Sequence, residues 1–158
     1  MNPIQVHLML AHLPVVGMLA AIALLIIGLI SKSELVFKIA CGFLIACSLF
    51  AVGTYLSGPP SYEIIEAAHL AEEEIVERHA LFGQISFVGM ILLAAITLGA
   101  LIQYAQGEGP GKAIRWTLLI ASLILAGSLA FTAHEGGEIR HPELEDARVL
   151  SARSGSAD

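Results

Sequence analysis

Four long apolar stretches, separated by short polar segments, dominate the chain. Each stretch is long enough to cross a bilayer, because a membrane-spanning helix needs roughly 20 apolar residues at a rise of about 1.5 Å per residue. The predicted spans are Leu8–Ile30, Leu35–Leu56, Ala80–Tyr104 and Ala113–Ala133. The pattern therefore predicts an all-α integral membrane protein built as a four-helix bundle.

The polar segments between the spans contain residues that commonly end helices. Ser31–Glu34 is a polar turn, and a glycine-rich stretch at 107–111 separates the third span from the fourth. The Gly-Pro-Pro sequence at 58–60 is expected to stop the second span, because proline cannot donate a backbone hydrogen bond.

Residues 61–78 are polar but periodic, with apolar side chains on one helical face and glutamates on the other. This pattern predicts an additional amphipathic helix at the membrane surface. The chain then divides into a membrane domain, 1–142, and a polar C-terminal tail, 143–158.

The composition supports a membrane protein and excludes several other classes. Of 158 residues, 56% are hydrophobic and 14% are charged, whereas a soluble domain has about 25% charged residues. The net charge is −6 and no basic patch is present, so nucleic-acid binding is not expected.

The positions of the basic residues predict the orientation of the bundle. The two short loops on one side hold Lys32, Lys38, Lys112 and Arg115, whereas 61–79 holds six glutamates and one arginine. Short loops rich in lysine and arginine remain in the cytoplasm. We therefore expect a multi-pass protein of the bacterial inner membrane with both termini on the periplasmic side.

All six histidines fall at the opposite, outward ends of the predicted spans. They are His7, His12, His69, His79, His134 and His141. An imidazole at a membrane boundary needs polar partners or a metal, because a dry and unpaired polar group is costly. The histidine cluster is therefore the candidate functional site.

Three chemistries suit such a cluster. Haem b could be held between neutral imidazoles from two helices. A non-haem metal could bind His69, Glu72 and His79, whose spacings of three and seven would place them on one helical face. Alternatively, the histidines could be interfacial groups or proton carriers for quinol oxidation in a subunit without a cofactor.

Three short motifs carry a resemblance to a known family. They are His12-Leu13-Pro14-Val15, Arg78-His79-Ala80-Leu81-Phe82-Gly83, and the stretch Thr132–His141, which contains His134-Glu135-Gly136-Gly137. The chain resembles an uncharacterised family of bacterial four-helix membrane domains that have His-Phe-Pro and His-x-Gly-Gly motifs. The resemblance spans roughly residues 3–142, with Leu13 in place of the phenylalanine.

The resemblance implies a role in electron transfer, because relatives in this family are joined to c-type cytochrome or Rieske domains. It also implies that His12, His79, His134 and His141 match the family's histidine positions. Both implications agree with the haem interpretation of the histidine cluster.

Together these observations predict a b-type haem subunit of a redox complex rather than an independent enzyme. His12 and His79 are the preferred axial pair, because spans one and three lie diagonally in a simple bundle. His134 could replace either, or could hold a second haem with His69, His7 or His141. The expected partners are the bilayer, other subunits, and a basic soluble c-type cytochrome or a quinone. The alternatives are a cofactor-free structural or assembly subunit and a non-haem metal-binding membrane protein.

Overall fold

The computed structural model describes residues 2–68 and 70–140 and contains four α-helices in this part of the chain. The helices are α1 (Pro3–Ser31), α2 (Glu34–Ala67), α3 (Glu73–Ala105) and α4 (Lys112–Arg140). Each is long and apolar enough to cross a membrane. The predicted all-α membrane bundle is confirmed. The predicted tail, 143–158, lies outside the described residues.

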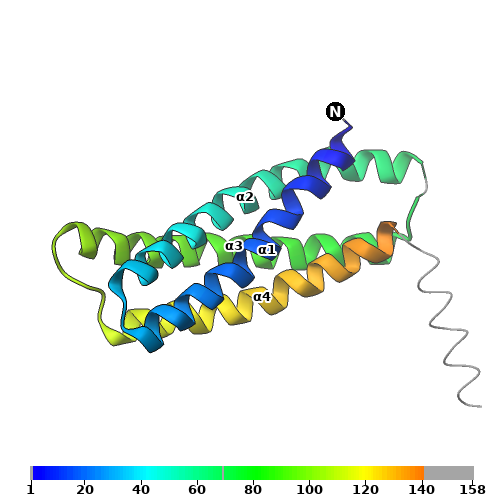
Figure 1. Cartoon of the computed structure of the whole chain (residues 1–158). Helices are drawn as coiled ribbons and strands as arrows, with labels where there is room; N and C mark the ends of the chain where they lie inside the picture. Colours follow the sequence, from blue (N-terminus) through cyan, green and yellow to red (C-terminus); the bar gives the residue numbers. More distant parts are fainter. Residues whose placement is uncertain (1, 69, 141–158) are drawn as a thin grey trace, which may run out of the picture.

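The helices form an up-and-down bundle in which each helix packs mainly against two neighbours (Figure 1). Contacts join α1 to α2 and α4, and α3 to the same two helices, so α1 and α3 lie on the diagonal, as expected. The start of α1, the connection between α2 and α3, and the end of α4 lie together at one end of the bundle. We call it the histidine end (residues 2–12, 54–68, 70–79 and 132–140), and the opposite end (31–38 and 104–115) the loop end.

Local capping interactions define the first helix and the start of the second. The Asn2 side chain accepts a hydrogen bond from the Ile4 amide at 3.0 Å, and Pro3 occupies the first turn. Ser33 caps α2 by accepting from the Val36 amide at 3.4 Å. Gly28 is required at the turn, because a Cβ there would lie 3.1 Å from the Phe37 amide nitrogen.

Apolar side chains from all four helices fill the interior, and others face outward. Fully buried side chains include Met18, Phe37, Met90 and Leu118. Large apolar side chains such as Ile124, which is 68% exposed, cover the outside and suit contact with lipid. Because lipid is itself apolar, close packing and interhelical hydrogen bonds, rather than water exclusion, stabilise the helix contacts.

The structure differs from expectation at the Gly-Pro-Pro sequence, because α2 continues through Pro59 and Pro60. Neighbouring hydroxyls bond to backbone carbonyls at this point. Ser57 donates to the Thr54 carbonyl and Ser61 to the Ser57 carbonyl, both at 2.9 Å. The carbonyls that lose a donor to the two prolines are those of Tyr55 and Leu56, so these hydroxyls bond to adjacent backbone groups of the same turns and do not replace the missing bonds.

Residues 61–78 do not form one separate amphipathic helix. Residues 61–67 are the end of α2, and 73–78 are the start of α3. The apolar face is nonetheless turned inward, since Ile75 and Val76 are 6% and 8% exposed. The break between the two helices follows Ala68, whose amide donates to the Ile64 carbonyl at 3.2 Å. The sequence around this break contains no glycine or proline that would have predicted it.

Close packing of α1 against α2 predicts opposite effects of two alanine substitutions. A Cβ on Gly17 would lie 2.6 Å from the Sγ of Cys47, which is buried, whereas one on Gly42 meets nothing within 4 Å. Gly17→Ala is expected to lower the free energy of unfolding by about 1–3 kcal/mol through overpacking. Gly42→Ala should raise it by up to about 1 kcal/mol through helix propensity. Denaturant titration in micelles measures both, and equal stability of the two variants would contradict the prediction.

Candidate functional site

His7 lies in the second turn of α1 and is held against α2. Its Nδ1 lies 3.1 Å from the Thr54 carbonyl oxygen and 3.0 Å from the Ser57 hydroxyl. Because a carbonyl oxygen only accepts hydrogen bonds, Nδ1 must carry the proton that is donated to it. The extension of α2 through the two prolines keeps this stretch of α2 helical beside His7.

His79 lies in the second turn of α3 and is held in the same way by α4. Its Nδ1 donates to the Thr132 carbonyl oxygen at 2.9 Å. The α4 backbone approaches the ring closely at Gly136, where a Cβ would lie 3.0 Å from His79 Cε1. The site therefore needs glycine at position 136.

The two imidazoles meet across the diagonal of the bundle. Their ring centroids are 6.2 Å apart and their planes are inclined by 76°. Since Nδ1 of each ring is engaged by a carbonyl of a neighbouring helix, Nε2 is the nitrogen that remains for another ligand. Histidines that bind metals are commonly oriented by such a hydrogen bond on the other ring nitrogen.

An ion pair between an exposed arginine and a buried glutamate lies next to the imidazoles in the sequence. Glu135 is 4% exposed, and its Oε2 accepts a hydrogen bond from Arg78 Nε at 3.1 Å. Arg78 also lies 3.8 Å from the exposed carboxylate of Glu74. The sequence analysis did not single out Glu135, although its position beside His134, and that of Arg78 beside His79, could have suggested a link between α3 and α4.

Hydroxyl groups continue the polar contacts from His79 toward the bundle centre. The hydroxyls of Ser86 and Ser128 are 2.7 Å apart, and Thr132 Oγ1 lies 3.4 Å from the Ser86 hydroxyl. Thr132 also donates to the Ser128 carbonyl at 2.9 Å. These bonds fix the level at which α3 and α4 pack, and so the position of the carbonyl that orients His79.

Two other predicted histidines, His12 and His134, contact groups of their own helices. His12 is exposed, and its Nδ1 bonds to the Leu8 carbonyl of its own helix. The exposed His134 has its Nε2 3.4 Å from Glu138 Oε1. His69 and His141 lie outside the described residues.

The non-haem site expected at His69, Glu72 and His79 includes one residue, His69, that lies outside the described part of the chain. Glu72 is exposed and precedes the first residue of α3, so helical spacing does not place it with His79. Among residues 2–68 and 70–140, no three histidine, cysteine, aspartate or glutamate side chains are arranged to hold a metal ion. The described site is therefore a pair of imidazoles.

A comparison with known protein families identifies the chain's relatives. The family model described as "Predicted membrane protein (DUF2231)" matches residues 3–141. The chain belongs to this family. The DUF2231 match covers α1 to α4 and confirms the predicted membership of an uncharacterised membrane family. No curated protein and no solved structure matches the chain.

Proposed function

We propose that this protein is a membrane-anchored electron-transfer subunit that binds haem b at the histidine end, with His79 and His7 as the axial ligands. The observation that supports this proposal is the imidazole pair itself, with ring centroids 6.2 Å apart. In this proposal the second ligand is His7, whereas the sequence predicts His12. When bound, the haem supplies one-electron redox chemistry.

The donor set suits a haem better than a bare metal ion. A bare transition metal in a protein usually takes three or four protein ligands, whereas a haem supplies four nitrogens of its own and needs only axial ligands. The described residues offer two imidazoles from different helices and no three-donor cluster. Gly58 and Gly136 lie beside the rings, since their added Cβ atoms would be 3.9 Å from His7 Cε1 and 3.0 Å from His79 Cε1.

The residues around the pair have separate tasks in this proposal. The carbonyls of Thr54 and Thr132 fix the tautomer and direction of each ring. Arg78 compensates the negative charge of the buried Glu135 carboxylate, which lies close to the site. The rings are thereby oriented before a ligand arrives.

The distribution of charge supports the proposed orientation and partner. The lysines and Arg115 of the loop end favour a cytoplasmic position for that end, so the histidine end and both termini would face the periplasm. Exposed glutamates on the last turns of α2 and first turns of α3 would attract a basic redox partner, such as a soluble c-type cytochrome. Transfer across the whole membrane would require further subunits or a quinone, since the described residues place no histidine at the loop end.

Difference spectroscopy tests the proposal. We expect protein purified from membranes after haem-replete expression to show a Soret band and a b-type α-band on reduction. His79→Ala and His7→Ala should lose the band, because each removes an axial nitrogen. His12→Ala is the matched control and should retain it, since His12 is exposed and bonds to its own helix.

Two results would contradict this assignment. No Soret band in the unmodified protein would reject haem binding. Loss of the band in His12→Ala but not in His7→Ala would reject His7 as a ligand and restore the pair expected from the sequence.

The same hydrogen bonds favour one alternative, a structural subunit without a cofactor. His7 links α1 to α2 and His79 links α3 to α4, and interhelical hydrogen bonds stabilise membrane bundles by about 0.6–2 kcal/mol. In that case His79→Ala would lower stability, and the unmodified protein would have no haem spectrum.

A further inference from the structure

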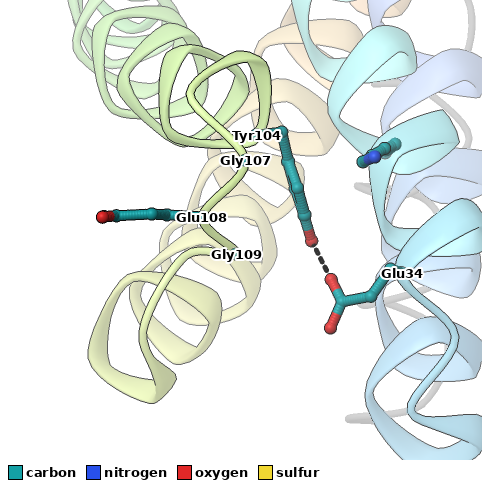
Figure 2. Close-up of a pocket in the computed structure, with 6 residues that line it drawn as sticks. Glu34, Tyr104, Gly107, Glu108 and Gly109 are labelled. Carbon is teal, nitrogen blue, oxygen red and sulfur yellow. Dashed lines mark hydrogen bonds between the residues drawn. The ribbon is translucent and has the colours of Figure 1, made fainter.

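A polar cluster at the loop end joins three helices. The Glu34 carboxylate at the start of α2 accepts hydrogen bonds from Arg115 of α4, with Nη2 2.7 Å from each oxygen. The hydroxyl of Tyr104, near the end of α3, also donates to Glu34 (Figure 2). Arg115 further donates from Nε to the Pro110 carbonyl at 2.8 Å. The negative charge of Glu34 is thus compensated within the protein.

A cavity of about 340 Å³ lies beside this cluster, and we call it the Lys38 cavity. Its lining consists of Glu34, Lys38, Tyr104, Gly107, Glu108 and Gly109. The Lys38 ammonium lies 4.6 Å from the centroid of the Tyr104 ring, which turns it toward the cavity. Figure 2 shows the Glu108 side chain pointing away from Tyr104 and Glu34.

The cavity is lined by two carboxylates, Glu34 and Glu108, and one ammonium group, Lys38. Because Glu34 is paired with Arg115 and Glu108 points away, Lys38 is the charge that is left to face a ligand. Both oxygens of Glu34 are held by Arg115, whereas no carboxylate of the described residues lies within 4.0 Å of the Lys38 ammonium in an ion pair. A free metal cation would meet the Lys38 charge and would have to displace Arg115. An ammonium group on a flexible stem is, in contrast, a common ligand for phosphate.

We propose that the Lys38 cavity binds the phosphate headgroup of an anionic phospholipid. Lys38 is one turn into α2, at the level where a long basic side chain extends toward the headgroups. Exposed apolar side chains follow two of the lining residues along α2: Leu35, next to Glu34, is 68% exposed, and Ile39, next to Lys38, is 44% exposed. Ile102 of α3 is 48% exposed at the same end. The phosphate contacts Lys38, and the acyl chains lie along these apolar residues.

The apolar residues beside the cavity distinguish a lipid from a soluble anion. A free phosphate would gain only the contact with Lys38, whereas a phospholipid also covers exposed apolar surface inside the bilayer. This inference goes beyond the proposed redox function and depends on a different end of the bundle.

Native mass spectrometry of the full chain in micelles tests the proposal. Phosphatidylglycerol and phosphatidylcholine are titrated separately, and we expect a retained phosphatidylglycerol adduct that phosphatidylcholine does not match. Lys38→Gln should weaken phosphatidylglycerol binding about tenfold, because it removes a direct hydrogen bond between two charged groups and not only diffuse attraction to the surface. Lys38→Arg should retain most of it, because the charge is kept.

Lys112→Gln is the matched control, since it removes an exposed lysine at the same end that does not line the cavity. It should leave the preference for phosphatidylglycerol nearly unchanged. Equal weakening by Lys38→Gln and Lys112→Gln would overturn the proposal in favour of diffuse surface attraction. Competition by glycerol phosphate at the same concentration as the lipid would overturn it in favour of a soluble anion. Neither result depends on haem, which is measured separately by its spectrum.

Discussion

Replacing Arg78 with methionine is expected to lower the free energy of unfolding by about 1–3 kcal/mol, because it leaves the buried Glu135 carboxylate without its half-exposed cation. Glu135 has a side chain that is 5% exposed, and Arg78 Nε lies 3.1 Å from it. Methionine keeps most of the apolar stem of arginine, so the loss reports mainly on the charge. Equilibrium unfolding in micelles, followed by circular dichroism, measures the effect.

The exposed partner of the same arginine provides a control. Glu74 is 3.8 Å from Arg78 and its side chain is 80% exposed, so Glu74→Gln should change stability by less than about 0.5 kcal/mol. The double variant Arg78→Met/Glu135→Gln should be more stable than Arg78→Met alone, because no uncompensated charge remains. If the double variant is no more stable than Arg78→Met alone, the uncompensated charge of Glu135 does not explain the instability of Arg78→Met.

Gly136→Ala should weaken haem binding at least about tenfold, because it moves an imidazole that must be correctly oriented to bind iron. The added Cβ would lie 3.0 Å from Cε1 and 3.3 Å from Nδ1 of His79. The ring must shift to make room, which strains its hydrogen bond to the Thr132 carbonyl. Haem titration followed at the Soret band measures the affinity.

The adjacent Gly137 gives a matched control, because a Cβ there meets nothing within 4 Å. Both glycines lie within α4, so both alanine variants gain similar helix propensity. Gly137→Ala should therefore bind haem as the unmodified protein does and be slightly more stable. Equal haem affinity in the two variants would show that contact between α4 and the His79 ring does not control binding.

The spans were predictable from the sequence because twenty or so apolar residues in a row have few other stable environments. The full lengths of the helices were not. The 34 residues of α2 correspond to about 51 Å, well beyond the roughly 30 Å of a hydrocarbon core. Outside the bilayer, apolar patterning weakens, and Pro59 and Pro60 indicated a helix end where α2 in fact continues.

The candidate site was predictable in its location but not in its pairing. The alternating direction of the four spans is enough to predict that the histidines gather at one end of the bundle. The contact of His7 with His79 depends on the Thr54 carbonyl, which belongs to a different helix and is 47 residues from His7. The position of His12 in the sequence does not indicate how its imidazole ring is oriented in the bundle. The partner of Glu135 likewise depends on the packing of α3 against α4.

The way the two imidazoles are anchored has a consequence for motion within the bundle. His7 is fixed to α2 within the first helical hairpin, and His79 is fixed to α4 within the second. As long as both hydrogen bonds hold, their 6.2 Å separation therefore reports the position of one hairpin relative to the other. A ligand that joins both rings would act as a crosslink between the hairpins, and its release would free them to slide. Spin labels on α2 and α4 would report that sliding as a change in the distance between the hairpins.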